Sequence, residues 1–142
     1  MKVLYATDGL PPAVAAGELM KTLFARDGVE VTVATVTYSG SLDPGHVLLE
    51  IDPIEDRRRQ SEQIVDAAVK DLEEAGFKAV PLVLEGKPGH ELVGAVEEGG
   101  FDVVVVGEGG PPSIGRRLLG SVSTHVLRHA GCAALVVPGP ND

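Results

Sequence analysis

An aspartate followed by four consecutive valines, Asp102 to Val106, constrains the fold more than any other segment of this chain. β-Branched residues favour extended backbone, because the pleated surface of a sheet accommodates their stiff side chains. A strand with one face in water alternates apolar and polar residues, whereas this run is apolar throughout after its first residue. We therefore expect a strand covered on both faces, as in a parallel sheet that lies between two layers of helices.

Further strand-like runs and helical patterns alternate along the rest of the chain. Strands are predicted at Lys2–Thr7, Val29–Val36, Lys78–Leu84, Asp102–Val106 and Ala133–Val137. Helices are predicted at Pro11–Arg26, Ile54–Ala75, Glu91–Glu98 and Gly120–His129. Such alternation implies right-handed crossovers between parallel strands. The sequence thus predicts a single α/β domain over residues 1–142, an open parallel five-stranded sheet with helices on both faces.

The spacing of apolar residues predicts which face of a helix is buried. For the first helix we expect the buried stripe to hold Val14, Leu19, Leu23 and Phe24. At the end of the second helix, Gly76 stands where a left-handed residue commonly terminates a helix.

Composition and charge limit the partners and the compartment. The formal net charge is −9, which disfavours binding to nucleic acid or to an anionic membrane. The apolar run Ala133 to Pro138 is too short to span a bilayer, and the segment after Lys2 does not have the pattern of a signal peptide. A single cysteine, Cys132, excludes an intramolecular disulfide. We expect a cytoplasmic protein without nucleic-acid or membrane partners.

A glycine-rich segment joins the fourth predicted strand to the last predicted helix. Its spacing is Gly107, two residues, Gly110, nine residues, then Gly120-Ser121. Glycines let backbone amides approach a phosphate without a Cβ in the way. The helix that follows offers unpaired N–H groups and the positive end of its dipole, to which Ser121 and Ser123 add hydroxyl groups. The segment therefore has the features of a phosphate site.

The same glycine-rich segment is also compatible with a purely structural role. A surface turn with Ser121 as an ordinary N-cap would account for the same residues. The segment lacks the Gly-Lys-Ser/Thr of a Walker A loop, and a dinucleotide fingerprint would follow the first strand instead. No Gly-x-Ser-x-Gly elbow surrounds Ser121, so a hydrolase nucleophile is not predicted.

A second polar turn, Ala6-Thr7-Asp8-Gly9, ends the first predicted strand. The carboxyl ends of parallel strands meet at one edge of a sheet, where such proteins bind their ligands. The Asp8 carboxylate is suited to accept hydrogen bonds from ribose hydroxyls or from an adenine amino group. Capping of the helix that follows is the alternative role.

These motifs together resemble the universal stress protein family. The resemblance rests on Asp8-Gly9 after the first strand, Gly86-Lys87-Pro88 after the third, Asp102 to Gly107, and the segment from Leu118 to Pro138. It extends over essentially the whole chain. The Gly-x2-Gly-x9-Gly-Ser pattern is the mark of the ATP-binding branch of that family, and the implied fold is Rossmann-like, of the adenine nucleotide α-hydrolase-like type.

The resemblance implies a site for ATP. Asp8 would contact the adenosine part, Thr7 and Val36 would lie against the base, and Val106 would offer backbone groups to the nucleotide. The phosphates would be held by Gly107, Gly110, Gly120, Ser121, Val122 and Ser123. Mg²⁺ or Mn²⁺ would be bound through the phosphates. The last strand, Ala133–Val137, would pair across a homodimer interface.

The chain departs from the family pattern at two places. The family usually has a small hydroxyl residue and then His or Arg where this chain has Glu108 and Gly109, and it has Ser where this chain has Leu10. Glu108 brings a negative charge beside the expected phosphates. This charge either weakens ATP binding or helps to hold a divalent metal, and a general-base role toward water is a further alternative.

We expect an ATP-binding regulatory or stress-response module with little or no turnover. One alternative is slow ATP hydrolysis with a divalent ion at the same site, and another is a homodimeric interaction protein that binds no nucleotide.

His125 and His129 are four residues apart on the last predicted helix, a spacing that suits a metal. No third ligand is evident nearby, so surface or dimer-contact roles are favoured for this pair.

Overall fold

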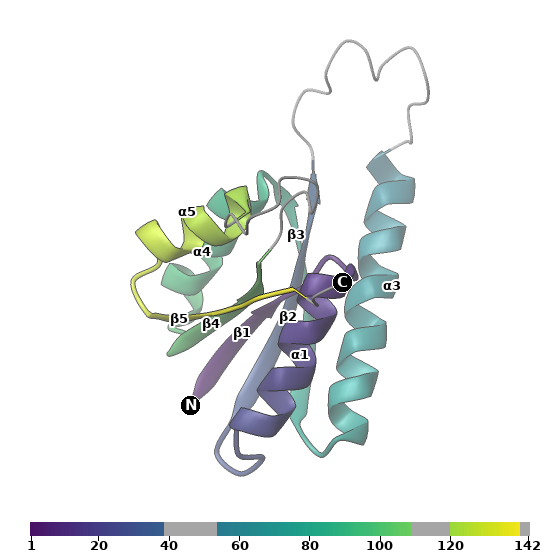
Figure 1. Cartoon of the computed structure of the whole chain (residues 1–142). Helices are drawn as coiled ribbons and strands as arrows, with labels where there is room; N and C mark the ends of the chain where they lie inside the picture. The colour runs from purple at the N-terminus through teal and green to yellow at the C-terminus, as the bar shows by residue number, and fades with distance from the viewer. Residues whose placement is uncertain (39–53, 109–119, 140–142) are drawn as a thin grey trace.

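A computed structural model describes residues 1–38, 54–108 and 120–139 of the chain (Figure 1). Strands and helices alternate in the predicted order. The strands are β1 (Lys2–Ala6), β2 (Glu30–Tyr38), β3 (Lys78–Gly86), β4 (Val103–Gly107) and β5 (Ala133–Val137). The helices are α1 (Pro11–Leu23), α3 (Ile54–Glu74), α4 (Pro88–Gly99) and α5 (Ser121–His129). In the described ranges, no helix is both long enough and apolar enough to cross a membrane.

All strands pair in parallel in one five-stranded sheet with the order β3-β2-β1-β4-β5. Helices α1 and α3 cover one face of the sheet, and α4 and α5 cover the other (Figure 1). The predicted fold class is therefore confirmed. The chain builds the sheet outward from β1 in one direction through β2 and β3, and then in the other through β4 and β5. The direction of winding reverses between β1 and β4.

The valine run lies in the interior, as predicted. Val104 and Val105 are completely buried and Val106 is 3% exposed. Val105 packs in the apolar cluster under α1 and α3, whereas Val104 and Val106 pack in the cluster under α4 and α5. Because successive strand residues point to opposite faces, the uninterrupted apolar run serves both layers of helices.

The buried face of α1 differs from the prediction. Val14, Leu19 and Leu23 are exposed, and the buried residues of this helix are Ala13, Ala16, Gly17 and Met20. The buried set follows the i, i+3, i+4, i+7 spacing of one helix face, whereas the larger residues do not. A Cβ at Gly17 would lie only 2.6 Å from the hydroxyl oxygen of Tyr5. The small residues therefore let α1 approach Tyr5 closely, and close packing decides which face is buried.

The predicted end of α3 is confirmed in detail. Gly76 has φ +94°, and its N–H donates to Glu73 C=O at 3.0 Å. Phe77 N–H donates to Leu72 C=O, also at 3.0 Å, and both of these side chains are buried. This pair of bonds is a Schellman motif, in which a left-handed glycine lets the chain turn back to satisfy the last carbonyl groups.

Candidate functional site

The candidate site lies at the carboxyl ends of β1 and β4, where the order of the strands reverses. The chain leaves β1 for α1 on one face of the sheet, and α5, the helix that follows β4 in the chain, lies on the other face (Figure 1). Diverging connections of this kind open a crevice between the two strand ends. Three groups of predicted site residues border this edge: the β1–α1 turn, the end of β4 and the start of α5.

The β1–α1 turn is held by its own side chains. The Asp8 carboxylate accepts a hydrogen bond from Leu10 N–H at 2.9 Å, and Thr7 Oγ1 accepts one from Gly9 N–H at 3.0 Å. Gly9 has φ +78°, a left-handed conformation that suits glycine. Leu10 is the N-cap of α1, so Asp8 orders the turn without capping the first turn of the helix. Asp8 is exposed and Thr7 is buried.

Strand β2 extends two residues beyond its predicted end, and this brings Val36 to the edge of the site. From Thr35 to Tyr38, β2 is paired with β3 alone among the described strands. Alternate residues of a parallel strand direct their backbone groups to the same neighbour. Ala34 C=O accepts a bond from Thr7 N–H at 2.9 Å, so Val36 also directs its N–H and C=O to the side of β1. Because β1 has ended there, these groups have no strand partner on that side among the described residues.

At the end of β4, the backbone groups of Val106 and Glu108 are directed to β5. Glu108 N–H donates to Val137 C=O at 2.7 Å, so Val106, two residues earlier, also directs its backbone groups to β5. The family resemblance implies that Val106 offers backbone groups to the nucleotide. In the structure those groups are directed to β5, and the side chain of Val106 is buried. Glu108 itself is half-buried at the same edge.

Gly107 is required by packing. A Cβ at this position would lie 2.7 Å from Ala13 N and closer still to the carbonyl group of Pro12. The sequence suggested that the missing side chain leaves room for a ligand. In the structure, the first turn of α1 occupies that space.

The first amides of α5 have no partner within their own helix. Its first internal bond runs from Thr124 N–H to Gly120 C=O at 2.9 Å, so the N–H groups of Ser121, Val122 and Ser123 precede the helical ladder. Gly120, not Ser121, is the N-cap. Ser121 is exposed, whereas Ser123 is 2% exposed and its hydroxyl donates to Gly120 C=O at 3.1 Å. Ser123 therefore stabilises the first turn of the helix instead of presenting a free hydroxyl.

Gly109 and Gly110 lie outside the described residues. His125 and His129 have ring centroids 4.5 Å apart, and within the described ranges no three metal-binding side chains come together.

Sequence reasoning missed Arg57. In the sequence, the run Arg57 to Arg59 follows Glu55-Asp56 and predicts a solvated helix face, which holds for Arg58 and Arg59, both exposed. Arg57 is half-buried, and its guanidinium donates to Tyr38 C=O at 2.7 Å, at the carboxyl end of β2. Its position one helical turn before the buried Ser61 is the signal that could have separated it from its neighbours.

Fold and crevice define a doubly wound α/β protein with its ligand edge at a topological switch point. A model of the universal stress protein family matches residues 1–138. Universal stress protein MJ0577 of Methanocaldococcus jannaschii is 35% identical over 73 residues, which is 51% of this chain and 45% of that relative. YxiE, a universal stress protein of Bacillus subtilis, is 30% identical over 111 residues, 78% of this chain and 74% of its own.

Solved structures agree with this assignment. The structure of MJ0577 superposes with a TM-score of 0.77 at 26% identity, covering 99% of this chain and 97% of the other. A universal stress protein in complex with cAMP superposes with a TM-score of 0.70 at 25% identity, covering 97% and 96% of the two chains. This chain belongs to the universal stress protein family. The sequence match to MJ0577 spans less than half of that relative, although the fold match spans nearly all of it.

Proposed function

We propose that this protein binds ATP at the carboxyl ends of β1 and β4 and acts as a regulatory or stress-response module with little or no turnover. The observation that supports the proposal is the position of the Asp8 turn and the α5 N-terminus at one edge of the sheet, with the first α5 amides not bonded within their helix. A related protein of the same fold is described in complex with cAMP, another adenine nucleotide. A cytoplasmic location stays a prediction from the sequence.

Each part of this edge suits one part of the nucleotide. The exposed Asp8 carboxylate has acceptor capacity beyond its bond to Leu10 N–H, which suits ribose hydroxyls. The adjacent N–H and C=O of Val36 form a donor and acceptor pair complementary to the edge of adenine. The N–H groups of Ser121 to Ser123 and the positive end of the α5 dipole suit the phosphates. Gly110 and Gly120 would complete the phosphate cradle.

A divalent cation fits this arrangement. Mg²⁺ and Mn²⁺ favour oxygen ligands, and Mg²⁺ usually combines one or two carboxylates with phosphate oxygens. Glu108 lies at the same edge and is half-buried. When bound, the metal would neutralise part of the phosphate charge beside this carboxylate, and Glu108 would supply one oxygen ligand.

A thermal-shift series tests the proposal. The melting temperature is measured without ligand, with AMP and with ATP, each with and without magnesium, because a ligand of the native state raises it. We expect stabilisation by ATP. An unchanged melting temperature under every condition would favour the interaction protein that binds no nucleotide. Product analysis after incubation with ATP would identify turnover.

Replacing Asp8 by Ala should weaken AMP and ATP more than inorganic triphosphate. A hydrogen bond to a charged group contributes about 1.5–3 kcal/mol, and triphosphate has no ribose to make it. Calorimetric titration of both proteins with AMP and with triphosphate measures the difference. Equal losses for the two ligands would mean that Asp8 acts only on the turn.

Replacing Glu108 by Gln should improve metal-free ATP binding and reduce its dependence on magnesium. Removal of one negative charge near the phosphates is worth about 1 kcal/mol, or roughly fivefold in Kd. Titrations of both proteins with ATP, in EDTA and in magnesium, measure this change. If both show the same metal dependence, Glu108 points to solvent and carries no functional role.

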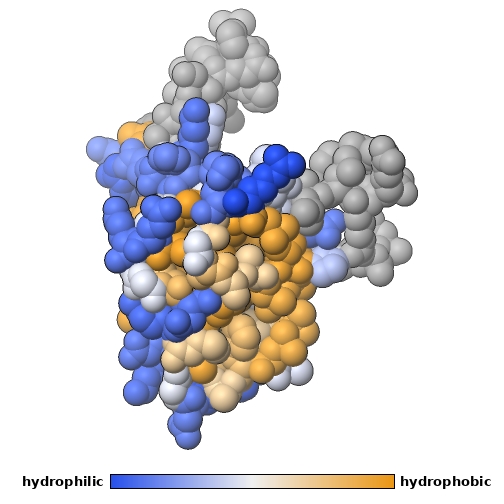
Figure 2. Space-filling model, turned by 90° about the vertical axis from the view of Figure 1, so that its left-hand side faces the viewer, coloured by the Kyte–Doolittle hydropathy of each residue, from blue (hydrophilic) through white to orange (hydrophobic). Residues whose placement is uncertain are grey.

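We also propose a homodimer that forms through β5, an edge strand of the sheet. Figure 2 looks at the side of the molecule on which α4, α5 and β5 lie, and a broad apolar surface faces the viewer there. Leu127 of α5 is 46% exposed, and Ala134, Leu135 and Val136 of β5 are only half-buried. An unpaired apolar edge strand is a ready partner for a second copy.

The β5 register allows a selective test. Val137 directs its backbone groups to β4, so Ala134 and Val136 direct theirs to the open edge. Replacing Ala134 by Pro removes an outward N–H, which an edge strand tolerates. Sedimentation velocity should show a dimer for the unaltered protein and a monomer for the variant. A dimer that survives the substitution would place the interface elsewhere.

A further inference from the structure

A groove of about 550 Å³ separates α1 from α3 on their face of the sheet. Its floor holds Tyr5 of β1 and Thr7 just beyond that strand. Its walls include Val14 of α1 with Ile64 and Ala67 of α3. A volume of this size suits one small organic molecule. The groove is remote from α5, and only its upper end reaches the β1–α1 turn.

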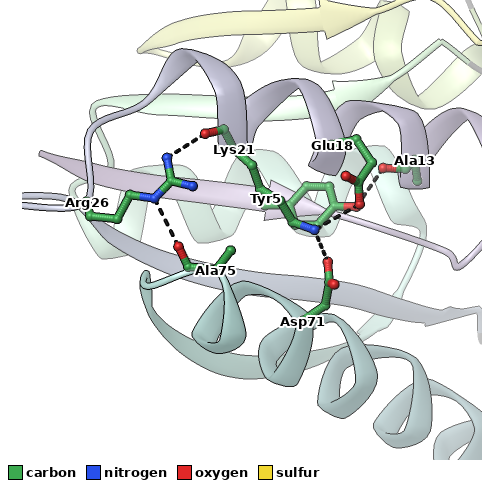
Figure 3. Close-up of polar contacts among 7 residues, drawn as sticks. All are labelled: Tyr5, Ala13, Glu18, Lys21, Arg26, Asp71 and Ala75. Atoms are coloured by element: carbon green, nitrogen blue, oxygen red, sulfur yellow. Dashed lines mark hydrogen bonds and ion pairs between the residues drawn. The ribbon is translucent and has the colours of Figure 1, made fainter.

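Side-chain contacts join the two helices at one end of the groove. Lys21 of α1 forms ion pairs with Glu18 of its own helix and with Asp71 of α3 (Figure 3). Arg26, just beyond α1, donates to Ala75 C=O at 3.0 Å, next to the end of α3. Beyond these contacts the α3 wall carries the small side chain of Ala67, which leaves space between the helices.

Tyr5 and Lys21 each keep one protonation state near pH 7. Tyr5 donates its hydroxyl proton to Ala13 C=O at 2.6 Å, and burial raises the pKa of Tyr5, so the hydroxyl stays neutral near pH 7. Burial by itself lowers the pKa of Lys21, but hydrogen bonds to Asp71 and Glu18 outweigh it and the net direction is upward. Lys21 therefore stays charged.

The charged side chains of the groove favour a ligand that carries a positive charge. Glu18 and Asp71 are the charged side chains among the described residues that line it, and both are acidic. They share one ammonium group, that of Lys21, while the Arg26 guanidinium at the same end donates to backbone carbonyl groups instead. Both carboxylates are more than half exposed, so a ligand cation can reach them without displacing Lys21. The net charge of the chain, −9, adds to the attraction for cations.

We propose that the groove between α1 and α3 is a second ligand site, which takes a small amphipathic organic cation. Its apolar body lies over Tyr5 between Val14, Ile64 and Ala67, and its ammonium group lies beside Glu18 and Asp71. The groove meets the proposed nucleotide site only at the β1–α1 turn, through Thr7 and Gly9, and its ligand binds without a nucleotide.

Three probes of similar size and different charge test this proposal: 4-phenylbutylamine, 4-phenylbutanol and 5-phenylpentanoate. Each is titrated into nucleotide-free protein and followed by amide chemical shifts in NMR. We expect the amine to bind at least about fivefold more tightly than the carboxylate, the difference that about 1 kcal/mol of charge interaction produces. Its shifts should cluster at the residues that line the groove.

Matched variants locate the binding. Ala67 is exposed and lines the groove, so Ala67→Leu should fill the space and lower the affinity for the amine and the alcohol alike. Thr22→Leu adds a similar side chain on the exposed surface of α1 away from the groove and should change neither. Glu18→Gln should weaken the amine severalfold and leave the alcohol unchanged, and it alters only an exposed side chain.

Several results would overturn the proposal. These are no binding by any probe, a carboxylate that binds as tightly as the amine, and an Ala67→Leu variant, folded by circular dichroism, with unchanged affinity. Shifts confined to the ends of β1 and β4 would equally contradict it. Because no nucleotide is present, failure of ATP binding leaves these outcomes unaffected.

Discussion

Replacing Gly107 by Ala should destabilise the protein by about 3 kcal/mol or more, at the upper end of what overpacking costs. The added Cβ would collide with the backbone of Pro12 and Ala13, and backbone atoms cannot rotate away as a side chain can. This cost is a large share of the roughly 5–15 kcal/mol that stabilises a typical domain. Urea unfolding followed by circular dichroism measures the free energy of unfolding.

Gly94→Ala is the matched control. Gly94 lies within α4, and a Cβ there would meet no atom within 4 Å. Alanine favours a helix over glycine by about 1 kcal/mol, so this variant should be slightly more stable. Equal stability of Gly107→Ala and the unaltered protein would show that α1 does not lie against the end of β4 in solution.

Replacing Gly120 by Val should lower the affinity for ATP at least about 100-fold, or about 2.8 kcal/mol, while the protein stays folded. Gly120 has φ −66° and ψ 162°, a conformation that valine adopts without strain. The branched side chain would occupy the space in front of the α5 amides, where we propose that the phosphates lie. Calorimetric titration with ATP measures the affinity.

Gly131→Val serves as the control for Gly120→Val. Gly131 lies in the turn before β5, and a Cβ there meets nothing within 4 Å. This variant should bind ATP as the unaltered protein does. Unchanged affinity in Gly120→Val, with its fold intact, would contradict the assignment of the phosphate site to the start of α5.

The fold was largely predictable from the sequence because its strongest signals are local. Four valines in a row fit a strand buried on both faces, and Gly76 fits a left-handed helix end. The alternation of strands and helices then leaves few arrangements other than a parallel sheet. Family resemblance pointed in the same direction, and the family assignment was confirmed over residues 1–138.

What could not be predicted depends on contacts between distant segments. The buried face of α1 is set by Tyr5 beneath Gly17, and the need for glycine at position 107 is set by Pro12 and Ala13. Neither contact leaves a periodic pattern in the sequence. The buried hydroxyl of Ser123 and the half-buried Arg57 likewise follow from tertiary packing, which residue type alone does not reveal.

Amide chemical-shift mapping during an ATP titration tests the central claim most directly. We predict saturable shifts at Thr7, Asp8 and Val36, at Gly107 and Glu108, and from Gly120 to Ser123, all at the carboxyl edge of the sheet. Shifts should be small on the α1 and α3 walls of the groove and on β3. Absence of shifts at saturating ATP with magnesium, or shifts gathered away from the ends of β1 and β4, would contradict this account.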